Sequence, residues 1–200
     1  MKPSSILLIL ILFFGALFGG CDQNGVVDPL QHSVTAEGIN KTGGVSTIGN
    51  LLVSLISLPS GEGKNIPVST TQTVTRSGGG KLQLSYTYKS FLGINVSRTA
   101  TFTVAPYAVK KNVDVTMSFD TTCLGVRFKP EGLVFSKPAL LDFSANGLNI
   151  LNVLYNLYWD DENGNYVQMK TDGISINVLT GSLTCSKAQI PHFSRYGFGR

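Results

Sequence analysis

Charged side chains and histidine are scarce in this sequence of 200 residues. Lysine, arginine, aspartate and glutamate together make up 14% of the chain, and the formal net charge is only +4. The basic residues are scattered rather than gathered into a stripe, which argues against nucleic-acid binding. Because the only histidines are His32 and His192, a multi-histidine metal site or a Ser/His/Asp triad has little to build on. We predict no metal, no cofactor, no catalytic site for an external substrate and no nucleic-acid partner.

Long apolar runs are also missing, except at the N-terminus. Lys2 precedes an unbroken apolar run at residues 6–14, and the small residues Gly15, Ala16, Gly19 and Gly20 lie between this run and Cys21. The whole apolar stretch, residues 6–20, holds 15 residues, fewer than the roughly 20 that a membrane-spanning helix requires. This pattern is typical of an export signal over residues 1–20, which is removed and does not belong to the fold.

The end of this signal, Leu17-Phe18-Gly19-Gly20-Cys21, resembles the lipobox of bacterial lipoproteins. The resemblance implies that the Cys21 thiol receives a diacylglyceryl group and that the signal is cleaved just before it. It also implies further acylation by a fatty acid such as palmitate. The protein is then expected in the bacterial cell envelope, at the outer membrane or cell surface rather than the inner membrane, with the membrane as its partner through lipid on Cys21. The alternative is an ordinary secretory signal with a chance cysteine.

Cysteine is rare, with three residues in the chain. If Cys21 carries lipid, Cys123 and Cys185 remain as a pair in a compartment that permits oxidation. We predict a disulfide between them, which would close a loop of about sixty residues and contribute ~4 kcal/mol in the chain-entropy model. Two buried, reduced thiols are the alternative.

Residues 21–75 are rich in Gly, Ser, Thr, Asn and Pro, with one apolar island at residues 48–58. Such a composition buries little apolar surface, so we predict a flexible tether between the membrane and a folded domain. The island itself has leucines at helical spacing but is interrupted by serines, so both a short helix and an added strand remain open.

Residues 76–200 show short segments in which apolar and polar residues alternate between clusters of turn residues. Period two, frequent Val, Thr, Tyr and Phe, and turns every eight to twelve residues predict an all-β domain, an antiparallel β-sandwich. Asn163-Gly164 predicts a hairpin turn. The expected strands are residues 82–86, 101–104, 113–119, 125–128, 139–143, 154–159, 166–169, 174–178 and 182–190.

Three stretches in this part resemble the ZU-five domain, the β-sandwich of zonula-occludens, netrin-receptor and ankyrin proteins. They are the glycine-rich opening at residues 78–82, the strand and corner at 102–109, and the proline-glycine turn at 126–138. In the last, Phe128 and Phe135 are expected to turn inward across Pro130 and Gly132. Val104 and Tyr107 stand where the family usually has Ile and Gly. The resemblance covers about residues 75–196 and implies an interaction or structural module.

The triplet His192-Phe193-Ser194 near the C-terminus matches the closing strand of this family. Some of its members cut themselves at such a triplet between Phe and Ser, which implies a self-cleavage hypothesis for this chain. The serine hydroxyl would attack the preceding carbonyl, the histidine would handle the proton, and water would release the fragment. The alternative is structural, with His192 and Ser194 bonded to each other or to the backbone beside a packed Phe193.

The sequence thus predicts a lipid-anchored cell-envelope protein that displays a β-sandwich for interaction or structure. Its partner, a protein or a glycan, is not identified by any motif. A carbohydrate-binding accessory lipoprotein is another hypothesis, and it would require exposed rings among Trp159, Tyr158 and Tyr166. These rings are also well suited to core packing or to pairing across strands.

Overall fold

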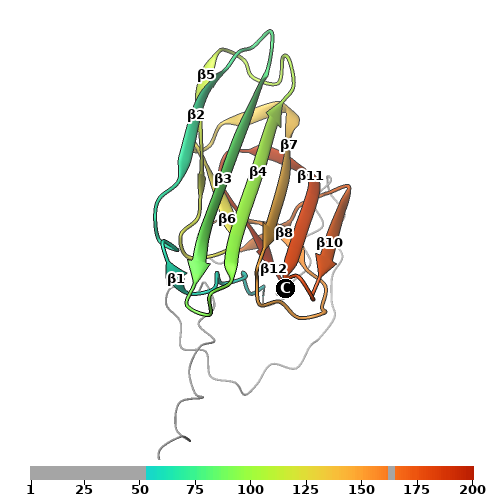
Figure 1. Ribbon diagram of the computed structural model, residues 1–200. Coiled ribbons are helices and arrows are strands. Elements are labelled where there is room, and N and C mark those ends of the chain that lie inside the picture. Colours follow the sequence, from blue (N-terminus) through green and yellow to red (C-terminus); the bar gives the residue numbers. More distant parts are fainter. Residues whose placement is uncertain (1–52, 162–164) are drawn as a thin grey trace, which may run out of the picture.

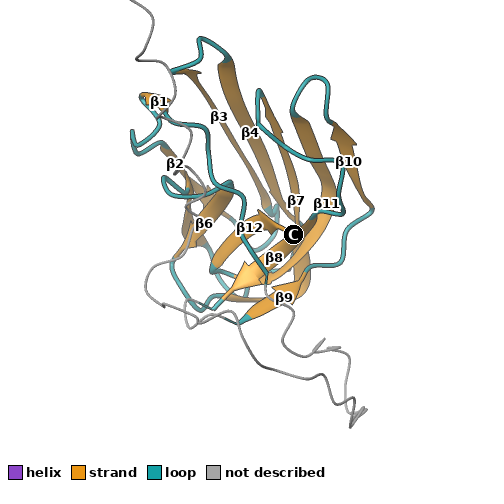
Figure 2. Ribbon diagram, turned by 90° about the horizontal axis from the view of Figure 1, so that it is seen from below, coloured by secondary structure: helices purple, strands orange, loops and turns teal. Residues whose placement is uncertain are grey.

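The computed structural model describes residues 53–161 and 165–200. These residues form two six-stranded antiparallel sheets that face each other, which confirms the predicted all-β sandwich. Figures 1 and 2 show the two layers from the side and from one end. In the described ranges no helix has the length and apolar character needed to cross a membrane.

The strands of the first sheet, the front sheet, lie nearest the viewer in Figure 1 in the order β1-β3-β4-β7-β11-β10. Their bounds are β1 Gly61–Glu62, β3 Gly80–Ser90, β4 Asn95–Val104, β7 Val134–Asn146, β10 Gly173–Asn177 and β11 Ser182–His192. The second sheet, the back sheet, has the order β2-β5-β6-β12-β8-β9. Its bounds are β2 Ser69–Val74, β5 Val113–Phe119, β6 Gly125–Lys129, β8 Asn156–Asp160, β9 Tyr166–Gln168 and β12 Arg195–Gly199.

The core lies between the sheets and follows the period-two alternation of the sequence. Along β4, Val96, Ala100, Phe102 and Val104 are buried, as is Arg98 on the same face, while the residues that alternate with them are more exposed. Phe128 and Phe135 both turn inward beside the Pro130–Gly132 turn, as predicted, and their rings contact Phe102 at centroid distances of 4.4 and 6.1 Å. Successive side chains of a strand point to opposite faces, so this alternation alone assigns them to core or solvent.

The fold begins earlier than the sequence indicated, and the predicted tether boundary at residue 75 is wrong. Strands β1 and β2 lie within it, and β2 pairs with β5 over six residue pairs. Since β2 is an edge strand with only Val74 fully buried, its Ser, Thr and Gln side chains can face water. A polar composition therefore did not mean an unfolded segment.

The described part of the apolar island, residues 53–58, forms neither a helix nor a full strand; it makes two isolated β-bridges, Leu55 with Gly199 and Ser57 with Cys123. Ser54 exchanges backbone hydrogen bonds with Arg200, and Ile56 N–H donates to Phe198 O. Leu55 and Leu58 are 4% and 3% exposed. Through these contacts the start of the described chain lies at one end of the sandwich, beside the C-terminus (Figure 1).

The two ends of the sandwich differ. We call the end where the described chain starts the hairpin end; it contains the β3–β4 turn (residues 91–94), the β7–β8 loop (147–155) and the β10–β11 turn (178–181). We call the opposite end the pocket end; it contains the β2–β3 turn (75–79), the β4–β5 loop (105–112) and the β6–β7 turn (130–133). The predicted Asn163-Gly164 turn lies outside the described residues, although β8 and β9 on either side do pair as a hairpin would.

Candidate functional site

The predicted lipid site, Cys21, and the predicted signal at residues 1–20 lie outside the described residues. The other predicted site residues lie within the sandwich. His192 ends β11, Phe193 and Ser194 form the turn that follows, and Arg195 begins β12. This turn carries the chain from the front sheet to the back sheet, because β11 and β12 belong to different sheets.

The turn at residues 192–194 is closely held by its neighbours. Phe193 is 2% exposed, and its ring lies 5.5 Å from that of Phe128 and 5.0 Å from that of Phe135. Its backbone N–H donates to Leu133 O at 2.8 Å. The Tyr196 hydroxyl donates to His192 O at 2.6 Å, and burial raises the pKa of that tyrosine.

The Ser194 hydroxyl has partners other than His192. It accepts a hydrogen bond from Trp159 Nε1 at 2.8 Å and donates a long one to Asp160 O at 3.5 Å. The His192 ring instead packs edge-on against Trp159, with the centroids 4.6 Å apart. Self-cleavage needs a base at this hydroxyl. Phe193 is packed as in the structural alternative, but the closer partner of the Ser194 hydroxyl is the Trp159 side chain rather than His192 or the backbone, and cleavage stays a prediction.

The predicted disulfide between Cys123 and Cys185 is not formed, and both thiols are buried. The two thiols have different neighbours. Cys185 lies on β11 within the hydrophobic core, where burial raises the pKa of its thiol to about 12. Cys123 lies in the β5–β6 turn, and its Sγ accepts a hydrogen bond from Arg195 Nη2 at 3.1 Å. The alternative of two buried, reduced thiols therefore describes this structure.

A buried ionic cluster joins the β5–β6 turn to β6, β8 and β12. Asp120 Oδ2 lies 3.0 Å from Nε of both Arg127 and Arg195, and Arg195 Nη1 lies 2.9 Å from Asp160 Oδ2. The contact from Arg195 Nε is an ion pair without hydrogen-bond alignment. Thr122 completes the cluster by donating both its N–H and its hydroxyl to Asp120 Oδ1.

The cluster favours the charged forms of Asp120 and Arg195. Burial acts to raise the pKa of Asp120, but the hydrogen bonds from Thr122 and the charges of Arg195 and Arg127 outweigh it and hold that pKa well below its usual range. Burial acts to lower the pKa of Arg195. Its interactions with Cys123, Asp120 and Asp160 outweigh burial and raise that pKa above its usual value. The cluster is thus an electrostatic link between strands, and sequence reasoning did not find it because its members are far apart in the chain.

A second buried cation, Arg98, forms no ion pair with a carboxylate of the described residues. It is 1% exposed, its Nη1 donates to Asp120 O at 2.7 Å, and its guanidinium lies 4.6 Å from the centroid of the Phe119 ring. Burial lowers the pKa of Arg98. The alternation of β4 could have revealed it, because Arg98 occupies an inward position between Val96 and Ala100.

The aromatic residues of the carbohydrate hypothesis do not form an exposed platform. Tyr158 is 8% exposed, and its ring meets that of Tyr166 edge to face at 6.5 Å. Trp159 is partly buried against the core and packed on His192. Sugar-binding platforms present ring faces to solvent, so a glycan would have to bind elsewhere on this molecule.

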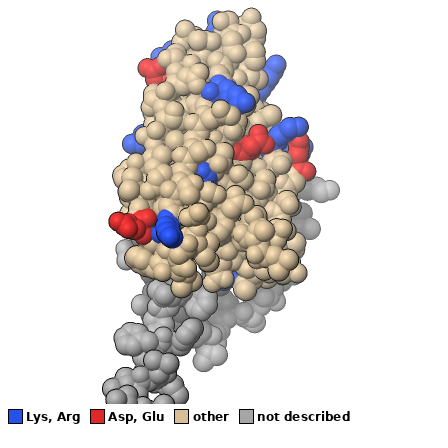
Figure 3. Space-filling view, in the orientation of Figure 1, with Lys and Arg blue, Asp and Glu red and all other residues tan. Residues whose placement is uncertain are grey.

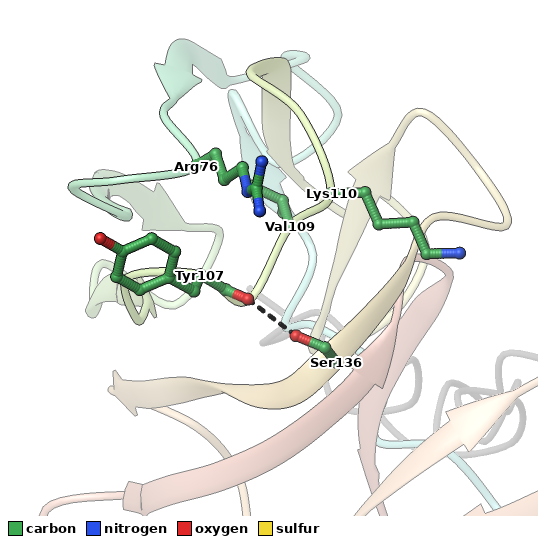
Figure 4. A pocket seen from close by; sticks show the side chains of 5 residues that line it. All are labelled: Arg76, Tyr107, Val109, Lys110 and Ser136. Atoms are coloured by element: carbon green, nitrogen blue, oxygen red, sulfur yellow. Dashed lines mark hydrogen bonds between the residues drawn. The ribbon is translucent and has the colours of Figure 1, made fainter.

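The pocket end carries a small open pocket of about 250 Å³, lined by Arg76, Tyr107, Val109, Lys110 and Ser136 (Figure 4). The Tyr107 ring is 63% exposed and turns away from the Lys110 side chain in this view. Its backbone is held in place, because Tyr107 N–H donates to Arg76 O at 2.7 Å and the Ser136 hydroxyl donates to Tyr107 O at 2.8 Å.

Tyr107 also has a strained backbone, with φ of 62°. This is the position at which the ZU-five resemblance expects glycine, the residue that adopts positive φ most readily. Among the described residues, Lys187 is the only other non-glycine residue with positive φ. Strained residues that persist are concentrated at binding sites, so Tyr107 with Arg76 and Lys110 is the binding candidate that sequence reasoning missed.

Metal binding has no candidate in residues 53–161 and 165–200, where no three His, Cys, Asp or Glu side chains are grouped to hold an ion. The comparisons with known proteins add no function. No family model matches the chain, and neither a curated protein nor a solved structure matches it.

Proposed function

We propose that the protein is a lipid-anchored component of a bacterial cell envelope and that its sandwich serves as an interaction or structural module. One observation carries the proposal: Cys21 follows Gly19-Gly20 at the end of an apolar stretch of 15 residues with a lysine before it. This is the order of parts that an exported, acylated protein requires. The ZU-five resemblance of the sandwich supports the interaction role in the same way, as a resemblance.

The physical argument for the anchor is the number of acyl chains. Each methylene buried in a membrane contributes about 0.8 kcal/mol, so one chain gives reversible binding and two or three give lasting retention. Residues 22–52 separate Cys21 from the first described residue. Fully extended, those residues would span at most roughly 100 Å.

The Arg76–Lys110 pocket supports an interaction role. It has two cationic side chains, an exposed aromatic ring and no acidic lining residue. A guanidinium and an ammonium together favour a carboxylate, sulfate or phosphate group. The pocket is below the usual range of roughly 300–1,000 Å³ for a drug-sized ligand, so we propose that it binds an anionic group on a larger partner, such as an acidic glycan or protein.

The anchor is tested by expressing the full chain in bacteria and labelling the cells with an alkyne analogue of palmitate. We expect label on the wild type and retention in the membrane fraction, and loss of both in Cys21→Ala. Cys185→Ala is the matched control, because it removes a thiol inside the sandwich. Wild-type protein that is soluble, unlabelled and begins at a later residue would refute the proposal.

A further inference from the structure

The hairpin end exposes a concentration of large apolar side chains. Of the eleven large hydrophobic residues that are exposed in the described chain, eight lie on the three loops of this end. They are Phe91, Leu92, Ile94, Leu151, Val153, Leu154, Val178 and Leu179. Single exposed hydrophobic residues are ordinary, but a group of this kind marks an interaction site.

The three loops adjoin one another, so their apolar side chains form one surface. Leu148 N–H at the start of the β7–β8 loop donates to Gly181 O of the β10–β11 turn at 3.0 Å. A side chain at Gly147 would collide with Asn95 O, at the first residue of β4. Ser97 and Asn146, the next residues inward, are paired across β4 and β7. The loops thus lie together at one end of the front sheet, where β4 starts, β7 ends and β11 starts.

These apolar side chains are held outward by ordered turns. In the β3–β4 turn, Ser90 N–H donates to Ile94 O at 2.8 Å and Phe91 N–H to Ser60 O at 3.0 Å. Phe91 and Leu92 nevertheless remain 79% and 86% exposed. In the β10–β11 turn, Asn177 Oδ1 accepts hydrogen bonds from the N–H groups of residues 179 and 180, and Leu179 is 98% exposed.

Charge is absent from the same loops. Residues 90–95, 147–155 and 178–181 contain no Asp, Glu, Lys or Arg. In Figure 3 the lower right of the visible face, over the ends of β7 and β10, is almost free of charged side chains. At the border of this surface, Glu62 on β1 lies opposite Lys89 on β3, and Arg200 ends the chain. A surface without charge loses little hydration energy when it enters an apolar medium.

We propose that the hairpin end docks on the lipid bilayer, with the tips of the three loops inserted among the headgroups and the uppermost acyl carbons. This inference rests on the proposed lipid anchor. Two observations name the bilayer as occupant: the loops are apolar and uncharged, and the chain from Cys21 enters the sandwich at this end, where residue 54 pairs with residue 200. Lys89 and Arg200 would lie at the height of anionic headgroups. The Arg76–Lys110 pocket would then face away from the membrane.

The test places an environment-sensitive fluorophore on the full-length lipidated protein in vesicles of phosphatidylcholine and phosphatidylglycerol. Single variants Leu92→Cys and Leu179→Cys carry the probe at the hairpin end, and Lys111→Cys carries it at the pocket end. Cys21 is acylated and the other two native thiols are 0% exposed, so only the introduced thiol reacts. Because Leu92 and Leu179 are highly exposed, their substitution leaves the fold intact.

We expect the probes at Leu92 and Leu179 to shift their emission to shorter wavelengths on vesicle binding. Nitroxide-labelled lipids should quench them several-fold more than the probe at Lys111. Equal, weak quenching at all three positions would overturn the docking and leave the anchor intact. A wavelength shift without lipid quenching would assign the surface to protein, either a second copy or the chain's own N-terminal part, and would also overturn it. Mass spectrometry of the same sample reports whether Cys21 is acylated, so failure of the anchor is recognised separately.

Discussion

The two ends of the sandwich distribute charge in opposite ways. At the hairpin end the loop tips are apolar and uncharged, while the charged groups near this end, Arg98 and Asp120, are buried. At the pocket end Arg76 and Lys110 line an open pocket, and the aromatic rings of Phe102, Phe128 and Phe193 are buried beneath. The same two sheets thus carry one end suited to water and one end suited to an apolar medium. This is possible because the loops, and not the strands, decide which side chains the ends expose.

The buried charge of Asp120 should be the most sensitive point of the molecule. Asp120→Ala removes the buried carboxylate that faces Arg127 and Arg195 and leaves the buried Arg195 with one of its two carboxylate partners, Asp160. We expect the free energy of unfolding to fall by about 3–5 kcal/mol, measured by denaturant unfolding at neutral pH. Asp114→Ala is the control, because its carboxylate accepts a hydrogen bond from Thr73 on the exposed surface, and should change stability by at most about 0.5 kcal/mol. Equal losses in the two variants would contradict this reading.

Lowering the pH should weaken the contribution of the Asp120 carboxylate to the free energy of unfolding. The pKa of Asp120 is held well below its usual range in the folded protein, whereas the unfolded value is about 4. A depressed folded pKa gives stability that is complete above the unfolded pKa and is lost as the pH falls toward the folded one. The wild type should therefore lose part of its stability advantage over Asp120→Asn as the pH falls from about 5 to about 3, and more of it at still lower pH. An advantage that stays constant over this range would show that the carboxylate charge is not the cause.

Strain at the pocket end can be released by one substitution. Tyr107→Gly should raise the free energy of unfolding by up to about 1 kcal/mol, because glycine adopts positive φ without the steric cost that other residues incur. Tyr107→Ala removes the same ring but keeps the β-carbon, so it should not stabilise the protein. Thermal unfolding of both variants measures the effect. If alanine stabilises as much as glycine, the ring and not the backbone is the source of the cost.

Substitutions at the pocket end should weaken the binding of an anionic partner, whereas a substitution at the hairpin end should not, and neither should change stability appreciably. Arg76→Ala combined with Lys110→Ala should weaken binding to a sulfated polysaccharide several-fold, measured by surface plasmon resonance at fixed salt. Stability should change by no more than about 0.5 kcal/mol, because these are exposed surface positions. Lys89→Ala, at the border of the hairpin end, is the matched control and should retain wild-type binding. A similar loss in Lys89→Ala would mean that the polysaccharide senses net charge and not the pocket.

The smallest expected effect concerns the turn at residues 192–194. The Ser194 hydroxyl is engaged by Trp159 and Asp160 O, so we expect purified wild type and Ser194→Ala to be uncleaved at Phe193–Ser194, as read by intact mass. A C-terminal fragment that starts at Ser194 in the wild type and is lost in Ser194→Ala would support self-cleavage instead. Such a cut would detach β12 covalently while leaving it paired between β6 and β8.

Much of the sandwich was predictable because strands such as β4 and β5 alternate between buried and more exposed residues. Residues 113–119 were expected as a strand and form β5, and the inward turn of Phe128 and Phe135 was expected from the motif between them. Strands β1 and β2 were missed because edge strands bury few side chains, so hydrophobicity does not reveal them. The pairing of Cys123 with Cys185 was wrong because an even number of thiols says nothing about their distance.

Local properties follow directly from the order of the amino acids: which residues alternate between faces, where turns fall, and that a short apolar stretch precedes Cys21. Those properties follow from the two-residue period of a strand and from the conformational preferences of single residues. Only the tertiary structure decided which distant segments meet. It brought Asp120 to Arg195, set the Ser194 hydroxyl on Trp159 rather than on His192, and gathered three separate apolar loops at one end. Such contacts depend on the order and register of strands across two sheets, which no local pattern encodes.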